Sequence, residues 1–298
     1  MTQAAAIRNT TVERCGALSE KEFVAKYKET ATPVILTKMM EGWPARTKWS
    51  VDYLDAVAGE NIVPVYSSKP ARDKQHQHAA EQTIKLSDYL SMLKAGENDL
   101  RMFFYNLLEN VPTLLNDIKY PKLGLKFFKR LPVLFVGGRG ARVQMHYDID
   151  LADLVLCHFG GPKRVLLVPP EQSKYMYRVP YSFSALANVN FENPDFDKYP
   201  ALQHIDAQWA DLQHGDALYI PSGYWHYVIY QDIGFSMTLR AFPTKLKGRL
   251  SLIKNIFFTR LVEGFMRKCF GQRWNDRNER LAVALTHKNL ECQRESGQ

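Results

Sequence analysis

Short strand-like runs separated by glycine and proline fill residues 134–239 of this chain. Each run is apolar or alternates apolar and polar residues, as β-strands do, and turn-forming residues follow it. A chain that repeats many short strands buries its apolar faces by packing two sheets together or by closing into a barrel. We therefore expect a β-sandwich or barrel, with the long polar segment 181–211 as an insert between strands. The runs are residues 134–136, 142–147, 154–159, 164–168, 217–220, 225–230 and 235–239.

The regions on either side of these strands divide the chain into three parts. Residues 1–18 carry no clear pattern, and we expect a flexible N-terminus. Residues 19–244 are expected to form one domain, since a chain of 298 residues with 46% hydrophobic content can bury a large core. A capping box that begins at Ser19 and a buried strand near residues 33–36 predict N-terminal α/β elements.

The C-terminal region, residues 245–298, combines an apolar helical face with positive charge. It carries 12 Lys or Arg and 5 Asp or Glu, a net charge of +7 out of the +8 of the whole chain. Such a surface binds nucleic acid, an anionic membrane or an acidic partner, or is only a solvated helix face. The apolar face must pack on the barrel, a second subunit or a membrane surface. Its residues recur at helical spacing: Leu250, Ile253, Ile256, Phe257, Leu261 and Phe265.

The sequence also argues against several classes of protein. It contains no apolar run of about 18 residues, so we expect no transmembrane helix. The first residues lack the basic start and apolar stretch of a signal peptide. Four cysteines lie far apart and form no Cys-x-x-Cys pair, which argues against a zinc finger or a disulfide scaffold. A reducing, cytoplasmic location is therefore expected.

Two histidines and one aspartate are the candidate metal ligands. His146 and Asp148 are two residues apart on an expected strand, so both side chains point to the same side. His226 follows the short apolar strand at residues 217–221. His-x-Asp alone is a weak motif, but here a second histidine and a set of barrel strands accompany it. Two imidazoles and one carboxylate suit one face of a non-haem Fe(II) ion and leave the opposite face for a cosubstrate and dioxygen.

A cosubstrate that is a 2-oxo acid would need a cation deep in the barrel for its distal carboxylate. Lys163 and Arg240 are the candidates, because each lies at the end of an apolar strand. A buried cation requires an anionic partner. The alternative is that each residue lies at a strand end and reaches solvent.

Taken together, these motifs resemble the JmjC/cupin-like family of Fe(II)- and 2-oxoglutarate-dependent hydroxylases. The resemblance covers roughly residues 19–242, and it is strongest to the branch that contains asparaginyl and tRNA wybutosine hydroxylases. The segments that carry it are Trp43-Pro44-Ala45, His146-Tyr147-Asp148, the strand that begins at Gly161-Pro162-Lys163, and the run from Gly215 to His226.

The resemblance implies a fold and a set of roles. The expected fold is mainly β with helices: a double-stranded β-helix barrel of the jelly-roll or cupin type, with N-terminal α/β elements and C-terminal helices. His146, Asp148 and His226 become the iron ligands, and Lys163 becomes the partner of the distal carboxylate of 2-oxoglutarate. A tyrosine on an earlier strand usually assists. Phe103 and Tyr105 are expected to share a strand face, and only Tyr105 carries a hydroxyl.

Asp153 and Arg240 depart from the family pattern, in which asparagines commonly occupy their places. Two explanations remain open. Asp153 and Arg240 form one internal ion pair, which leaves Lys163 as the anchor of 2-oxoglutarate. Alternatively, Arg240 binds 2-oxoglutarate itself.

The function implied is a 2-oxoglutarate-dependent oxygenase that hydroxylates a macromolecule, either a protein side chain or an RNA base. The basic C-terminal helices favour RNA. We expect a homodimer through the helices of residues 245–298, because these helices pair in the related branch and their apolar face here needs a cover. The alternatives are a non-catalytic metal-binding cupin-like protein and a hydroxylase of small molecules.

Overall fold

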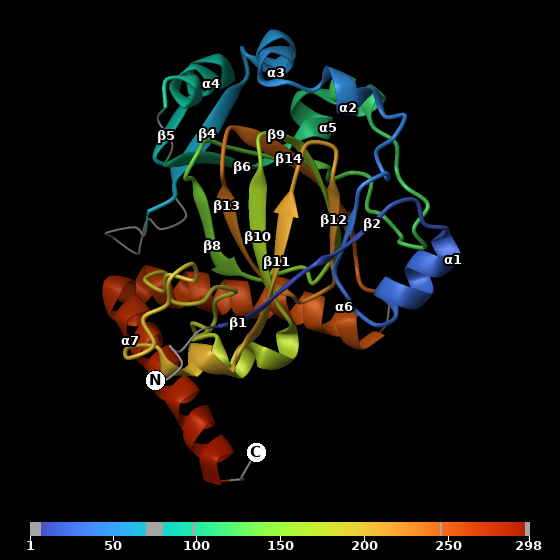
Figure 1. The fold of residues 1–298 in the computed structure, drawn as a ribbon. Coiled ribbons are helices and arrows are strands. Elements are labelled where there is room, and N and C mark those ends of the chain that lie inside the picture. The colour runs from blue at the N-terminus through green and yellow to red at the C-terminus, as the bar shows by residue number, and fades with distance from the viewer. Residues whose placement is uncertain (1–6, 70–79, 97–98, 245, 296–298) are drawn as a thin grey trace, which may run out of the picture.

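The computed structural model describes residues 7–69, 80–96, 99–244 and 246–295. Two β-sheets face each other and form the centre of the molecule, and helices lie around them (Figure 1). One sheet has five strands in the order β1-β11-β10-β13-β8. The other has nine strands in the order β2-β3-β12-β9-β14-β7-β6-β4-β5. The expected architecture, a jelly-roll barrel with additional helices, is confirmed.

The strands are short and mostly antiparallel to their neighbours. The five-stranded sheet consists of β1 (Arg8–Thr11), β8 (Arg142–His146), β10 (Lys163–Val168), β11 (Asp206–Leu212) and β13 (Trp225–Tyr230). The nine-stranded sheet consists of β2 (Glu13–Cys15), β3 (Val34–Leu36), β4 (Ile62–Ser67), β5 (Gln82–Lys85), β6 (Leu100–Asn106), β7 (Val133–Gly137), β9 (Asp153–Gly160), β12 (Ala217–Ile220) and β14 (Gly234–Ala241).

Helical segments precede, interrupt and follow the strands. The capping box at Ser19 is confirmed: its hydroxyl accepts from the Glu22 amide, and the Glu22 carboxylate accepts from the Ser19 amide. The helices before the barrel are α1 (Glu20–Phe23), η1 (Val24–Lys28), α2 (Pro44–Lys48), α3 (Val51–Ala58), α4 (Leu86–Lys94), α5 (Leu107–Asn110) and η3 (Pro112–Asp117). The later ones are η4 (Pro170–Tyr175), η5 (Pro200–His204), α6 (Leu246–Ile253), η6 (Lys254–Thr259) and α7 (Arg260–Glu295).

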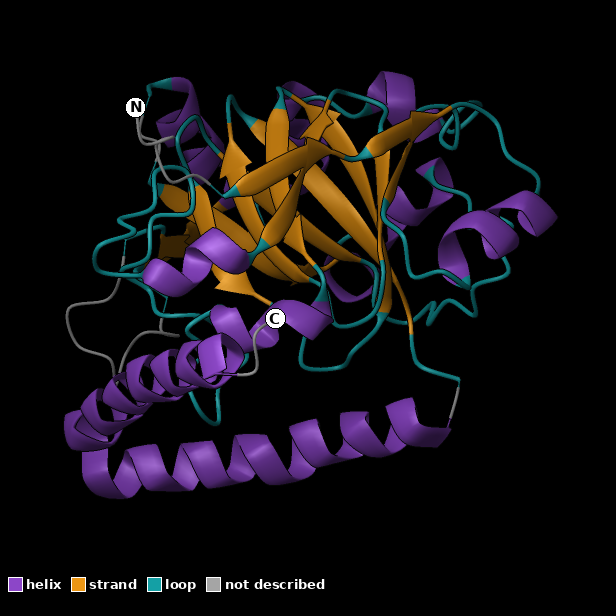
Figure 2. Cartoon of the chain, turned by 60° about the horizontal axis from the view of Figure 1, so that its bottom comes forward, coloured by secondary structure: helices purple, strands orange, loops and turns teal. Residues whose placement is uncertain are grey.

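Three apolar layers follow from the alternation of side chains along the strands. The inner layer fills the space between the sheets and includes Leu154, Val165 and Leu218. A second layer packs the outer face of the nine-stranded sheet against the N-terminal helices. A third packs the outer face of the five-stranded sheet against residues 175–205 and the end of α7 (Figure 2). The polar residues of the site therefore lie on the inner face, enclosed by both sheets.

Two sequence predictions about loops are wrong. Residues 8–15 of the expected flexible N-terminus form β1 and β2, which add parallel edge strands to both sheets, with Ile7 and Val12 buried. The expected polar insert 181–211 includes most of β11, which pairs with both β1 and β10. β1 and β2 are edge strands whose polar residues face solvent, which hides their apolar signal. β11 lies between β1 and β10, but it alternates buried residues with the exposed Asp206 and Asp211, so its run reads as polar.

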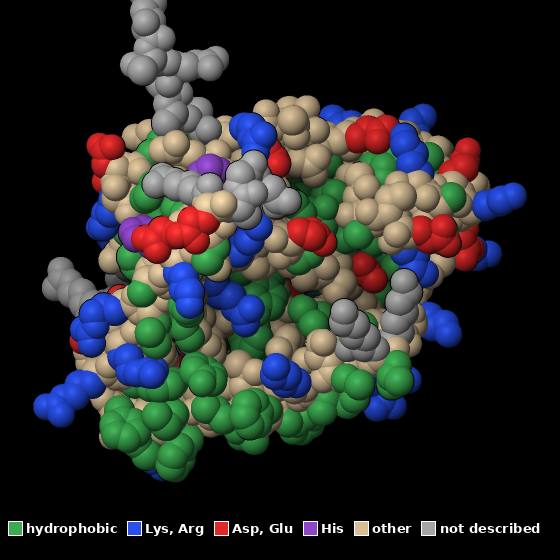
Figure 3. Space-filling view, turned by 90° about the horizontal axis from the view of Figure 1, so that it is seen from below, with side chains coloured by type: hydrophobic (Ala, Val, Ile, Leu, Met, Phe, Trp, Pro, Cys, Tyr) green, Lys and Arg blue, Asp and Glu red, His purple; other side chains and the backbone are tan. Residues whose placement is uncertain are grey.

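The C-terminal helices were expected and are present. Gly271 interrupts the long helix α7 with a positive φ of 52°, which a residue without Cβ adopts readily. A band of hydrophobic side chains lines one edge of the face seen in Figure 3. No helix in the described parts of the chain is long and apolar enough to span a membrane. The members of this band, here called the C-terminal apolar band, are Leu246, Leu250, Ile253, Phe257, Phe258, Leu261, Phe265 and Phe270.

Candidate metal centre

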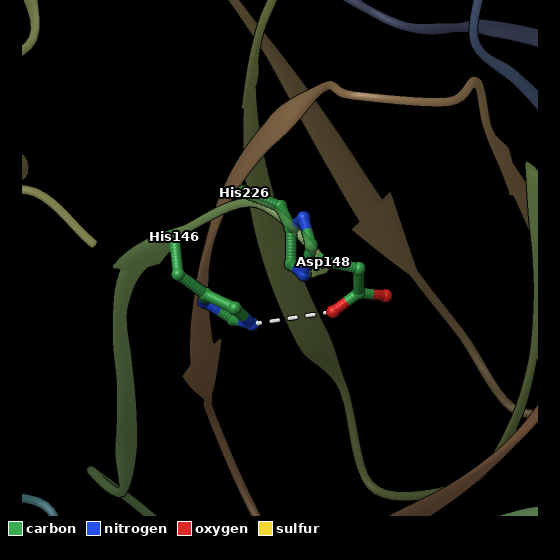
Figure 4. Close-up of side chains that lie close together, drawn as sticks. All are labelled: His146, Asp148 and His226. Atoms are coloured by element: carbon green, nitrogen blue, oxygen red, sulfur yellow. Dashed lines mark ion pairs between the residues drawn. The ribbon is translucent and has the colours of Figure 1, made fainter. Parts of the chain in front are cut away.

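The expected triad comes together on the inner face of the five-stranded sheet. His146 is the last residue of β8, and His226 is the second residue of the neighbouring strand β13. The two histidines are direct partners across these strands, and their ring centroids are 4.1 Å apart. Asp148 follows β8 and points to the same point as both rings (Figure 4). One ligand atom from each of the three side chains lies within 4.8 Å of the others, a spacing that fits a single metal ion.

Backbone carbonyls set the orientation of both imidazoles. The Nδ1 atom of His146 lies 2.8 Å from the carbonyl oxygen of Gln144, and that of His226 lies 3.2 Å from the carbonyl oxygen of Tyr224. A carbonyl only accepts, so each Nδ1 carries the proton and each Nε2 presents a lone pair. Burial, followed by the neighbouring His226, lowers the pKa of His146 to about 3. Burial also lowers the pKa of His226. Both rings are neutral at neutral pH, as metal ligands must be.

Asp148 is held by a buried arginine. The Oδ2 atom of Asp148 accepts a hydrogen bond of 2.7 Å from Nη2 of Arg240, while Oδ1 lies 3.9 Å from Nε2 of His146. Arg240 is 4% exposed and also donates to both oxygens of Asp150, at 2.8 and 2.9 Å. Burial raises the pKa of Asp148, but Arg240 and the two imidazoles outweigh it and leave that pKa below its usual value. Asp148 is thus an ionised carboxylate with one oxygen free to bind a cation.

The ion pair between Asp153 and Arg240, one of the two explanations that the sequence left open, is not found in the structure. In the pairing of β14 with β9, Arg240 lies opposite Leu154, so Asp153 points to the other face of the sheet. There Asp153 accepts hydrogen bonds from the Tyr219 hydroxyl, at 2.9 Å, and from the Ser222 amide, at 3.1 Å. The partners of Arg240 are Asp148 and Asp150 instead. Asp150 was missed because it lies in the turn after Asp148, where the Leu151 amide donates to the Asp148 carbonyl and the alternation of a strand no longer applies.

Lys163 is a buried cation, and the alternative that it reaches solvent is wrong. It is 2% exposed, and its Nζ donates to the Ser236 hydroxyl at 2.9 Å and to the Tyr230 hydroxyl at 3.2 Å. Within the described residues it has no carboxylate partner at ion-pair distance. Burial lowers its pKa to about 7. A lysine in this position is ready to receive an anion.

Tyr105 does not face the inner space, contrary to expectation. The pairing of β6 with β7 shifts between Met102 and Tyr105, because Phe104 adopts a positive φ of 60° and inserts an extra residue. Tyr105 therefore packs with Met102 in the outer core, where its hydroxyl is buried without a hydrogen-bond partner. Phe103 contacts Phe135 and Tyr66 instead. The two residues do not share a face, because a bulge between them breaks the alternation of the strand.

Several inner polar groups were missed, and two of them lack partners. Thr238 lies between Ser236 and Arg240 on the inner side of β14, and its buried hydroxyl makes no hydrogen bond to a described residue. The Nε atom of Arg101 on β6 is also buried and unpartnered. Orphaned buried polar atoms are rare in folded proteins, and on the inner face a polar ligand would supply the partners that these two atoms lack. Lys163, Thr238 and the triad together fit a metal and an anionic cosubstrate.

Comparison with known proteins agrees with this architecture. The cupin-like domain family matches residues 19–262. Jumonji C domain-containing protein 5 of Drosophila melanogaster is 30% identical over 246 residues, which are 77% of this chain and 59% of the fly protein. The human tRNA wybutosine-synthesizing protein 5 is 28% identical, over 76% of each chain. Lysine-specific demethylase JMJ30 of Arabidopsis thaliana is 30% identical over 73% of this chain.

The chain spans 51% of the Arabidopsis protein and 59% of the fly protein, so both relatives are considerably longer than the matched region. The family match, in contrast, covers well over half of this chain and contains all three residues of the triad. The chain therefore belongs to the family of cupin-like domain proteins.

Proposed function

We propose that this chain is an Fe(II)- and 2-oxoglutarate-dependent oxygenase that hydroxylates a macromolecule. The observation that carries the proposal is the inner face of the barrel, which combines the His146, Asp148 and His226 triad with a buried Lys163 that has no carboxylate partner among the described residues. The triad suits Fe(II) with open positions on one side. The lysine supplies a charge that an acid cosubstrate would neutralise.

Lys163 and Arg240 have different roles in this proposal. Bound iron and 2-oxoglutarate would supply the oxidant for a C–H bond, with dioxygen consumed and succinate and carbon dioxide formed. Lys163 binds the distal carboxylate of the cosubstrate. Arg240 orients Asp148 and keeps it ionised, because its Nε and Nη2 atoms are already engaged by two carboxylates. We therefore assign Arg240 an indirect effect on the cosubstrate, and we assign Asp153 and Tyr105 no contact with it.

A macromolecular substrate is supported by the names of the relatives and by charge. One relative is a tRNA wybutosine-synthesizing protein and another is a lysine-specific demethylase. The C-terminal region carries a net charge of +7, which favours RNA over a neutral peptide. A cytoplasmic location accords with four free cysteines in the described chain.

The experiment is a turnover assay with Fe(II), 2-oxoglutarate and dioxygen, in which succinate is measured alone and with pools of peptides or RNA. We expect slow succinate formation by the protein alone and faster formation with one pool. His146→Ala should abolish both, and His204→Ala, far from the triad in η5, should change neither. A wild-type protein that binds Fe(II) but forms no succinate under any condition would support the non-catalytic alternative. Succinate formation that is stimulated only by small molecules would support the alternative of a small-molecule hydroxylase.

We also propose that a second copy of the chain covers the C-terminal apolar band. A groove of about 550 Å³ lies beside the band on the kinked helix α7. The C-terminal apolar band of one copy can pack into the groove of a second copy, and the reverse. A two-fold dimer requires this kind of self-complementary surface. Apolar side chains line most of the groove: Tyr181, Val262, Met266, Phe270 and Trp274.

A further inference from the structure

We propose that Arg101 is a second cationic ligand for the distal carboxylate of the cosubstrate, beside Lys163. The inference rests on the proposed function and extends it to a residue on a different sheet. It concerns the specificity of the site, because two cations at one end of the cosubstrate select a dianionic 2-oxo acid over a monoanionic one.

The position of Arg101 follows from the pairing of its strand. On β6, Met102 faces the outer core, so its neighbour Arg101 faces the inner space. Arg101 is the direct partner of Gly137 on β7. A Cβ atom at Gly137 would lie 2.8 Å from the ring of Tyr230, so that ring rests on the glycine backbone beside Arg101. Tyr230 thus lies next to Arg101 on one side and bonds to Lys163 on the other.

Among the described residues, Arg101 has no anion to neutralise it. Its Nε atom is buried without a partner, and no described carboxylate forms an ion pair with it. Its guanidinium carbon lies 5.7 Å from the centre of the Phe103 ring, a contact that compensates only part of the lost hydration. Burial lowers the pKa of Arg101. Because Arg101 alternates with Met102 along β6, it faces the same inner space as Lys163 and the triad.

The distal carboxylate is the anion that fits this position best. His226, Val228 and Tyr230 point inward from one strand, so Tyr230 marks the end of the space away from the metal ligands. Lys163 and Thr238 offer donors around this end, and the Thr238 hydroxyl has no partner among the described residues. A forked guanidinium and an ammonium group together match the two oxygens of one carboxylate. A carboxylate bound to the metal would instead lie beside His146 and His226.

The test compares two ligands on the protein loaded with Mn(II), by calorimetry. The ligands are 2-oxoglutarate and 2-oxopentanoate, which has the same carbon chain but a methyl group in place of the distal carboxylate. We expect Arg101→Gln to weaken binding of 2-oxoglutarate by roughly 10- to 100-fold and to leave 2-oxopentanoate unchanged, because only the former offers an anion to the guanidinium. Arg101→Lys should restore part of the affinity.

Arg139→Gln is the matched control, since Arg139 is a largely exposed arginine in the loop after β7. It should bind both ligands as the wild type does, and thermal melting of each variant checks the fold. If Arg101→Gln lowers the affinity for both ligands equally, or for neither, the role of Arg101 is overturned. In that case, binding of 2-oxoglutarate by the wild type still supports the proposed function. A wild-type protein that binds Mn(II) but not 2-oxoglutarate overturns both.

Discussion

Arg240 and Lys163 are both buried cations on the inner face of the barrel, but their surroundings differ. Arg240 contacts two carboxylates, Asp148 and Asp150, within 2.9 Å. Among the described residues, the hydrogen-bond partners of Lys163 are two hydroxyl groups, and its Nζ also lies 4.3 Å from the centre of the Tyr230 ring. A satisfied cation holds structure in place, whereas an unsatisfied one costs stability until a ligand arrives. We therefore expect substitution of Arg240 to disturb the site and substitution of Lys163 to stabilise the cosubstrate-free protein.

Replacing Arg240 with glutamine should weaken metal binding. The change removes the donor that fixes Asp148 and also raises the pKa of that carboxylate, because Arg240 is the main group that lowers it. Loss of a residue that orients a metal ligand typically costs about 10- to 100-fold in affinity. Competition with a chelator measures the change. Arg164→Gln removes an arginine paired with the exposed Asp211 and should have no effect; a similar loss in both variants would contradict the role assigned to Arg240.

Replacing Lys163 with methionine should stabilise the cosubstrate-free protein and abolish its affinity for 2-oxoglutarate. The Lys163 pKa is about 7 in the folded state and about 10.4 in the unfolded chain. Between these values the unfolded state binds more protons, so wild-type stability rises with pH relative to the methionine variant. Tyr230, Ser236 and His158 are the neighbours of Lys163 and are present in both proteins.

The measurement is the difference in unfolding free energy between Lys163→Met and wild type, obtained by denaturant titration at several pH values. The difference should favour the variant and shrink by roughly 2 kcal/mol between about pH 7 and pH 9. A difference that stays constant across this range would show that the lysine keeps its ordinary pKa in the folded protein.

Strand β6 shows how far the sequence predicts the site. The triad was predictable because His146 and Asp148 obey the two-residue alternation of an extended chain. The same rule fails for Phe103 and Tyr105, because the positive φ of Phe104 adds a residue to the strand and reverses the alternation. A phenylalanine gives no sign of such a backbone, since positive φ is rare for bulky side chains. Likewise, the partners of Arg240 depend on which face of a strand pair each side chain occupies.

Because of this bulge, Tyr105→Phe should leave the KM for 2-oxoglutarate unchanged. The Tyr105 hydroxyl lies in the outer core and has no partner there, and burial raises its pKa to about 12. Removing an unsatisfied buried hydroxyl should leave stability equal or raise it by about 1 kcal/mol. Kinetics and thermal melting measure the two effects. A several-fold increase in KM would show that the hydroxyl reaches the cosubstrate after all.

At the scale of the whole molecule, the enclosed site and the exposed C-terminal apolar band lie on different parts of one chain. Residues near the end of α7, such as Ala282 and Leu290, pack on the outer face of the five-stranded sheet. In the described residues of the earlier part, Asn255 donates to the carbonyl of Ile149, but many apolar side chains remain exposed; Phe257 and Leu261, for example, are 63% and 66% exposed. A stretch of this kind usually marks an interaction surface.

Charge substitution in this band should convert a dimer into a monomer. Phe257→Glu combined with Leu261→Glu places two carboxylates in the apolar face, and their desolvation opposes association with a second copy. Light scattering at micromolar concentration should give twice the chain mass for the wild type and the chain mass, 34.3 kDa, for the variant. Val57→Glu, at an exposed apolar residue of α3, is the control and should remain dimeric. A wild-type monomer at this concentration contradicts the proposed dimer. The band would then be left for a partner other than a second copy.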